Sequence, residues 1–180
     1  VDVVRVFARV AAAMPATLVM VGDGPDRVLA QEEARTLGVA DRIAFLGRID
    51  AVAPLLAGAD LFLLPSATES FGLSALEALA TGVPVVASDA GGIPEVVRDG
   101  VTGALRPVGD VAGMADAALA ILRDDARWAA MSAAAQGDAR ARFGESRIIG
   151  RYEDVYADAL EKARARGAAR AVAGVAPAGR

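Results

Sequence analysis

Two glutamates stand eight positions apart in the segment Glu69-Ser70-Phe71-Gly72-Leu73-Ser74-Ala75-Leu76-Glu77. Glu69 ends a loop that follows an apolar run. Glu77 falls one turn inside an expected helix whose other residues are nearly all apolar. A carboxylate is almost never fully buried unless it is paired, because leaving it unpaired in an apolar setting is costly. Glu77 therefore either lies at a solvent edge or faces a polar ligand.

The start of that helix could bind a phosphorylated ligand. Free backbone N–H groups at a helix start can bind phosphate oxygens, and Gly72 lets a ligand approach the backbone closely. Glu77 would lie about 6 Å further along the helix axis. A diphosphate at the helix start, with one carboxylate beyond it on each side, suits a sugar–diphosphate–nucleoside. From spacing alone, the alternative has about even odds: Glu69 would be an ordinary solvent-exposed loop residue, and Glu77 an ordinary surface residue of the helix.

A glycine-containing loop, Gly22-Asp23-Gly24-Pro25, follows one expected strand and precedes a helix. It is not the dinucleotide-binding fingerprint, because the third glycine of that pattern would fall at Arg27, and it has no P-loop lysine. Taken in isolation, the loop is more typical of a tight turn with a helix starting at Pro25. The alternative is a loop shaped to pass close to a ligand, with Gly22 and Gly24 at the contact.

Three further segments carry isolated polar residues. Gly91-Gly92-Ile93-Pro94-Glu95 is most simply a strand-to-helix connection, with Glu95 complementing the helix dipole. Arg48 and Ile49 could hold a base by stacking and backbone contacts, although Asp50 is the expected N-cap of the next helix. Asp110 is interpreted only as a helix start.

Short apolar runs alternate with amphipathic helices along the chain. Strands are expected at 17–21, 43–46, 61–64, 83–87 and 102–105. Helices are expected at 2–13, 26–37, 50–57, 73–80, briefly from 94, and at 110–123, 125–142 and 146–165. This alternation predicts an α/β fold with a doubly wound, Rossmann-like parallel sheet. Ligands in such sheets bind outside the carboxyl ends of the strands, here the loops at 22–25, 47–50, 65–72 and 88–92.

Composition excludes several classes of function. The 180 residues include no Cys and no His, which removes disulfides, Ser-His-Asp triads and histidine–metal sites. No metal-ligand cluster is visible. The net charge of −4 and the 4% aromatic content argue against nucleic-acid binding. No apolar run reaches the roughly 18 residues of a membrane span, and no signal peptide is visible, so a cytoplasmic location is expected.

As an ordered series, these segments resemble the C-terminal, donor-binding half of the retaining GT-B glycosyltransferases of family 4. The resemblance runs from about residue 1 to 155 and rests on a set of short motifs. These are Val19–Pro25, Ile43–Gly47, Ala59–Ser66, Glu69–Leu73, Ala75–Ala78, Gly82–Ala87, Gly91–Val97 and Gly100–Gly103. Within the family, the segments at 46–52, 69–73 and 92–96 are most similar to members that transfer N-acetylglucosamine from UDP-N-acetylglucosamine to L-malate in bacillithiol biosynthesis.

The resemblance implies a role for each matching residue. Glu69 would be the catalytic-site residue that holds hydroxyls of the donor sugar, with Ser70 beside it. Backbone amides around Phe71, Gly72 and Leu73 would bind the diphosphate. Glu77 would bind the ribose hydroxyls, Arg48 and Ile49 would lie beside the uracil, and Gly22 and Gly24 would approach the donor. The UDP-sugar is a substrate, so no cofactor is expected, and the departing phosphate would help to take the acceptor's proton.

The resemblance also implies that a further domain binds the acceptor, while this chain binds the donor. The family's Arg/Lys pair that clamps the diphosphate and its acceptor-binding domain would both precede Val1. We therefore expect residues 1–166 to form a donor-binding domain without appreciable activity alone, and 167–180 to form a disordered tail. The acceptor would be a small molecule, with L-malate the first candidate. An apolar stripe at Ile148, Tyr152, Val155 and Tyr156 predicts some self-association.

Three other functions stay open on the sequence. The chain could belong to a family 4 transferase with a different sugar or acceptor. It could be a free-standing, non-catalytic module that binds nucleotide sugars. The least favoured is half of an NAD-dependent oxidoreductase, because the glycine fingerprint is missing.

Overall fold

The computed structural model describes residues 1–173, and side chains as far as residue 163. The chain divides into two compact units, Val1–Arg140 and a second unit that begins at Ala141. The expected extent of a donor-binding domain, residues 1–166, stays a prediction.

Five short parallel strands form the sheets of the first unit, in two hydrogen-bonded groups. They are β1 (Leu18–Val21), β2 (Ile43–Gly47), β3 (Phe62–Leu64), β4 (Val85–Ser88) and β5 (Gly103–Arg106). β1 pairs with β2, and β4 lies between β3 and β5, with Val86 in register with Leu63 and Ala104. Every pairing is parallel, as predicted. The sequence did not predict that the strands of the described residues would form two sheets rather than one.

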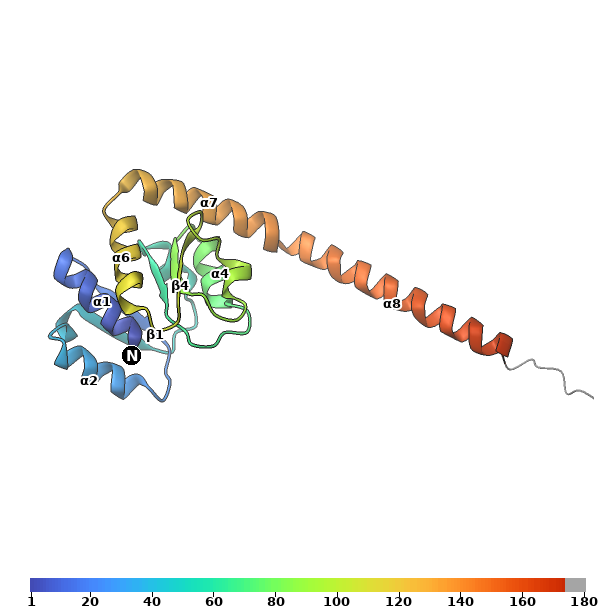
Figure 1. Ribbon diagram of the computed structural model, residues 1–180, viewed down its shortest axis with the longest axis horizontal. Coiled ribbons are helices and arrows are strands. Elements are labelled where there is room, and N and C mark those ends of the chain that lie inside the picture. The colour runs from blue at the N-terminus through green and yellow to red at the C-terminus, as the bar shows by residue number, and fades with distance from the viewer. Residues whose placement is uncertain (174–180) are drawn as a thin grey trace, which may run out of the picture. The chain divides into compact units, whose positions relative to one another are not determined.

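Helices alternate with these strands. The order is α1 (Asp2–Ala13), α2 (Arg27–Thr36), α3 (Ala53–Ala57), α4 (Leu73–Ala80), α5 (Ile93–Val96), α6 (Val111–Leu122), α7 (Asp125–Phe143) and α8 (Glu145–Ala173), with a 3-10 turn at Ala40–Arg42. α1 and α6 pack side by side against the sheets, and α2 lies beside α1 (Figure 1). The predicted α/β class is therefore confirmed.

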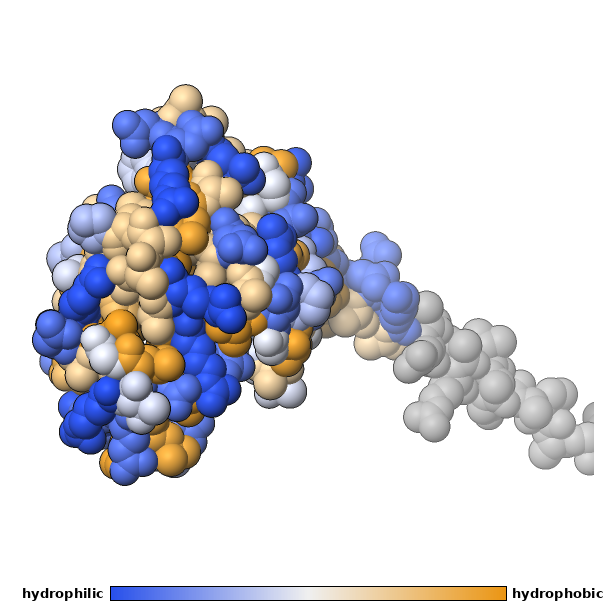
Figure 2. Space-filling model, turned by 60° about the vertical axis from the view of Figure 1, so that its left-hand side comes forward, coloured by the Kyte–Doolittle hydropathy of each residue, from blue (hydrophilic) through white to orange (hydrophobic). Residues whose placement is uncertain are grey.

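Two apolar clusters hold the first unit together. One joins α1 and α6 to β4 and β5 around Val86, Ala104 and Met114. The other joins α1 to α2 and β2 around Phe7, Ala34 and Ile43. Hydrophobic and hydrophilic residues are intermixed on the face that Figure 2 brings forward. Burying these helix and strand faces stabilises the unit that carries the loops of interest.

Two local expectations differ from the structure. Asp50 is not the N-cap of α3, because the helix begins at Ala53 after Val52. Pro54 occupies its first turn, where the missing N–H of proline costs nothing. α8 continues to Ala173, whereas we had expected a disordered tail from Gly167. The rest of that predicted tail, 174–180, lies outside the described residues. Asp110 does start a helix: its Oδ1 accepts a hydrogen bond from Gly113 N at 2.8 Å.

The second unit consists mainly of α8. Its large apolar side chains are exposed at positions that share one helix face: Ile149, Tyr152, Val155, Tyr156 and Leu160. No helix in the described part of the chain is long and apolar enough to cross a membrane.

Candidate functional site

The start of α4 lacks a side-chain cap in the described part of the chain. Gly72 is the N-cap and adopts a left-handed conformation, with φ 91° and ψ 42°. Within the described chain, no side chain makes a capping hydrogen bond at this end. The first intrahelical bond runs from Leu76 N to Gly72 O at 3.0 Å. The backbone N–H groups ahead of Leu76 in the helix therefore have no partner within it and can bind an anion.

Gly91 and Gly92 pack closely against the backbone of Glu69 and Ser70, in the loop that precedes α4; this contact is called the Gly91–Gly92 support. Gly92 N donates to Glu69 O at 3.0 Å. A Cβ added at Gly91 would overlap the carbonyl oxygen of Glu69, and one at Gly92 would lie 2.5 Å from Ser70 O. No side chain fits at either position without a shift of the backbone. The connection between β4 and α5 therefore fixes the path of the chain through Glu69 and Ser70.

The two glutamates differ in their surroundings. Glu69 is half-buried and lines a cavity of about 500 Å³ together with Ala67, Thr68, Ser70 and Gly91. Glu77 is exposed on α4, about 6 Å along the axis from the helix start. Glu77 is thus at a solvent edge, where its carboxylate is available to hydroxyl donors.

A second group of candidate residues lies on the loops after β1 and β2. Gly22 N donates to Gly47 O at 2.8 Å, which fastens the two loops together. Arg27 also links the loop after β1 to β2. Its Nη1 donates to Asp23 Oδ1 at 3.4 Å, and its Nη2 donates to Phe45 O at 3.4 Å. These bonds bring the segment Gly22–Gly24 beside Gly47, the residue immediately before Arg48 and Ile49.

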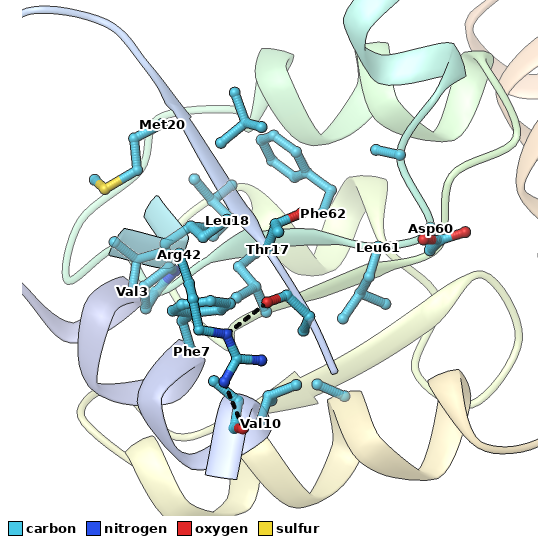
Figure 3. Close-up of a pocket in the computed structure, with 18 of the residues that line it drawn as sticks. Val3, Phe7, Val10, Thr17, Leu18, Met20, Arg42, Asp60, Leu61 and Phe62 are labelled. Carbon is cyan, nitrogen blue, oxygen red and sulfur yellow. Dashed lines mark hydrogen bonds between the residues drawn. The ribbon is translucent and has the colours of Figure 1, made fainter. Parts of the chain in front are cut away.

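The structure thus collects the candidates into two groups, each just beyond the carboxyl ends of parallel strands. The first contains Glu69, Ser70, Phe71, Gly72 and Leu73, with Glu77 one turn further on. The second contains Gly22, Gly24, Arg48 and Ile49. A cavity of about 1670 Å³ runs along β1 and β3 (Figure 3), and none of these candidate residues line it. Ser70, Phe71, Leu73 and Arg48 expose their side chains, while Ile49 is half-buried.

Sequence reasoning missed two features of the site. One is the support by Gly91 and Gly92, which we had interpreted as a simple connection. The other is Ser88 at the end of β4, which is fully buried and whose Oγ has no hydrogen-bond partner among the described residues. The available signal was a polar residue directly after the apolar run Val83–Ala87. No group of three or more Asp or Glu residues in the described chain is placed to hold a metal ion.

Comparison with known proteins identifies the family. The model of the family described as glycosyl transferases group 1 matches residues 2–124, more than half of the chain. The chain belongs to this family. The glycosyltransferase resembles N-acetyl-alpha-D-glucosaminyl L-malate synthase of Bacillus anthracis, with 43% identity over 159 residues, covering 88% of this chain and 42% of the relative.

Other similar proteins carry other names. The D-inositol 3-phosphate glycosyltransferase of Mycolicibacterium smegmatis is 37% identical over 169 residues, covering 89% of this chain and 38% of that protein. Among solved structures, HepE of Anabaena in complex with UDP and glucose is 30% identical with a TM-score of 0.78. That match covers 86% of this chain and 44% of HepE. The chain spans less than half the length of these relatives, and the structural neighbours are GT-B glycosyltransferases, as the resemblance implied.

Proposed function

We propose that this glycosyltransferase chain is the donor-binding part of a retaining enzyme that transfers N-acetylglucosamine from UDP-N-acetylglucosamine to L-malate. The observation that carries the proposal is the uncapped start of α4 at Gly72, held in place by the Gly91–Gly92 support. Helix N–H groups that already point outward can bind the diphosphate without reorganisation, and they would stabilise the negative charge that develops on it as it leaves. The similarity to the B. anthracis synthase favours this donor and acceptor.

In the proposed mechanism, the bond between the sugar's anomeric carbon and the β-phosphate oxygen breaks. The acceptor hydroxyl forms a new bond on the same face of the sugar, and its proton passes to the departing phosphate. Glu69, half-buried beside the cavity, would hold the donor sugar through its hydroxyls. Glu77 would accept hydrogen bonds from the ribose, and Arg48 and Ile49 would lie beside the uracil.

The charges at the site indicate that this chain alone binds the donor weakly. Arg27 is committed to Asp23 and the carbonyl of Phe45. Arg48 is exposed, so its contribution to binding a diphosphate is reduced by solvent screening. We therefore expect dissociation constants for UDP of roughly a millimolar, a binding free energy near −4 kcal/mol, and no appreciable turnover. Measurable transfer by the purified chain would contradict this expectation.

The first test is calorimetric titration of UDP and UDP-N-acetylglucosamine into the chain and its Glu77→Ala variant. Losing a charged hydrogen-bond acceptor typically costs about 1.5–3 kcal/mol, so we expect at least a tenfold weaker affinity. Glu32→Ala is the matched control, because Glu32 is also an exposed helical glutamate but lies on α2. Equal weakening by both variants, or no effect of Glu77→Ala, would remove the ribose role.

Activity is tested in a chimera in which this chain replaces the matching part of the B. anthracis synthase. Transfer to L-malate with retention at the anomeric carbon, and its loss in Glu69→Ala, would support the full proposal. The second candidate is a transferase acting on an inositol phosphate, because the M. smegmatis relative is similar over 89% of this chain. A folded chimera that binds UDP but prefers that acceptor would favour the second candidate.

A further inference from the structure

α5 touches the segment that carries the candidate donor residues at two points. Gly92, its N-cap, donates its N–H to Glu69 O at 3.0 Å. Ile93, which is completely buried, packs behind the start of α4, since a Cβ added at Gly72 would lie 3.6 Å from Ile93 Cγ1. The backbone at Glu69 and at Gly72 therefore follows the position of α5.

α5 is too short to hold its own position. It has four residues, about 6 Å of helix, and a helix of this length depends on tertiary contacts. Its C-terminal end runs into a tight turn. There Arg98 N donates to Thr102 Oγ1 at 2.9 Å, and Thr102 N donates to Arg98 O at 3.0 Å. Because Thr102 is completely buried, the backbone of Arg98 is fixed and its side chain leaves the turn from a defined point.

That side chain forms an ion pair with α7. Arg98 Nη1 donates to Asp138 Oδ1 at 3.1 Å, and the side chain of Asp138 is only 9% exposed, whereas that of Arg98 is 54% exposed. Ion pairs between exposed groups contribute little, because water screens them. Here the carboxylate is largely withdrawn from water, so losing the guanidinium costs more than it would at an open surface. The pair is therefore a directional tether between the end of α5 and α7.

Up to that point, α7 is firmly seated on the first unit. Three side chains on one face of the helix are buried, namely Met131, Ala135 and Ala139. A Cβ added at Gly82, just after α4, would lie 3.2 Å from Ser132 Oγ. α7 thus lies against the end of α4 and, through Asp138, against the end of α5. These are the two helices that border the candidate donor residues.

We propose that Arg98 and Asp138 are positioning residues of the donor site. Their ion pair fixes α5 on α7, and α5 in turn fixes the backbone at Glu69 and Gly72. The importance of the pair for sugar transfer rests on the proposed function, and neither side chain contacts the donor in this scheme. Packing alone does not explain a carboxylate at this largely buried position, since an apolar side chain would fill it without the cost of removing a charge from water.

The test is a double-mutant cycle in the full chain, with Arg98→Met, Asp138→Asn and both substitutions together. Methionine keeps most of the aliphatic stem of Arg98, and asparagine keeps the size of Asp138, so the variants should fold. The readout is hydrogen exchange of the Gly92 amide, which donates to Glu69 O. We expect exchange about tenfold faster in each single variant, and no faster in the double variant than in the faster of the two.

The amide of Gly22 is the control within each sample. It makes a bond of the same kind, donating to Gly47 O at 2.8 Å, but it joins the loops after β1 and β2. A general loss of stability speeds exchange at both amides alike, whereas the proposed role changes Gly92 alone. Equal acceleration at both amides, no change at Gly92, or additive effects in the double variant would overturn the proposal.

A second measurement connects the ion pair to the site. UDP is titrated into the chain and its Arg98→Met variant, and amide chemical shifts report binding. Arg5→Met is the matched control, because Arg5 is 49% exposed and its Nε lies 2.7 Å from Glu33 Oε1, an ion pair between α1 and α2. We expect UDP to bind about three- to tenfold more weakly to Arg98→Met only. Unchanged affinity alongside faster exchange at Gly92 would overturn the role in donor binding. If no chain binds UDP, the proposed function fails, and exchange at Gly92 alone decides whether the pair positions Glu69.

Discussion

At the scale of single residues, the close contact of Gly91 with Glu69 predicts a sharp difference between two loop glycines. Gly91 has φ 53°, and a Cβ there would overlap Glu69 O. We expect Gly91→Ala to lower the free energy of unfolding by about 2 kcal/mol or more, because the side chain is both strained and overpacked. Urea unfolding followed by far-ultraviolet circular dichroism measures this change.

Gly24→Ala is the control for that substitution. Gly24 has no atom within 4 Å of its added Cβ and does not need a left-handed conformation. Its unfolding free energy should stay unchanged or rise by about 0.5 kcal/mol. If both variants lost stability equally, the support behind Glu69 would not depend on the absence of a side chain at Gly91.

At the scale of elements, substitutions at two exposed glycines test the effect of backbone conformation alone, because an added side chain would contact nothing at either position. Gly137 lies inside α7, and Gly109 precedes α6 with φ 80°; neither has an atom within 4 Å of an added Cβ. Gly137→Ala should raise the free energy of unfolding by roughly 0.5–1 kcal/mol, because alanine favours the helix. Gly109→Ala should lower it by about 1 kcal/mol, since alanine is strained at positive φ. Thermal unfolding monitored by circular dichroism distinguishes the two, and shifts of the same sign would refute the argument.

Most helices and strands could be predicted because the residues that specify them, such as the apolar positions of a helix or the glycine before it, lie within the element or next to it in the sequence. The bounds of α1 (Asp2–Ala13) and α4 (Leu73–Ala80) agree with the sequence pattern, in which apolar spacing and Gly72 mark the helix. Asp50 misled because it is a favoured capping residue, but the helix starts only in the turn that contains Pro54.

The remaining features depend on partners far apart in the sequence. The contact of Gly91 and Gly92 with Glu69 and Ser70 joins two loops across about twenty residues, so no local pattern contains it. The division of the strands into two sheets depends on which edges meet, and the alternation of strands and helices is the same with one sheet or two. The candidate residues could be located in the sequence, but the way they are supported could not.

At the scale of the whole molecule, the exposed apolar face of α8 predicts self-association. Tyr152 is 61% and Tyr156 66% exposed, and Ile149 and Leu160 share their face of the helix. Exposed apolar patches of this kind promote association. We expect sedimentation velocity to show species larger than the monomer at high concentration, and Tyr152→Ser with Tyr156→Ser to reduce them. Leu29→Ser on α2, a comparably exposed apolar residue, is the control and should leave the distribution unchanged.

The anchoring of α7 gives the protein an optical reporter of its own. Trp128 is the only tryptophan in the chain, and its indole Nε1 donates to Asp60 O at 2.7 Å, two residues before β3. The indole also packs against the cluster that contains Met114 and Ile121. Indole emission moves to longer wavelength when the ring becomes hydrated. A shift of the emission maximum of Trp128 to longer wavelength therefore reports the loss of the contact between α7 and the segment just before β3. Stopped-flow fluorescence can therefore time that event without any attached label.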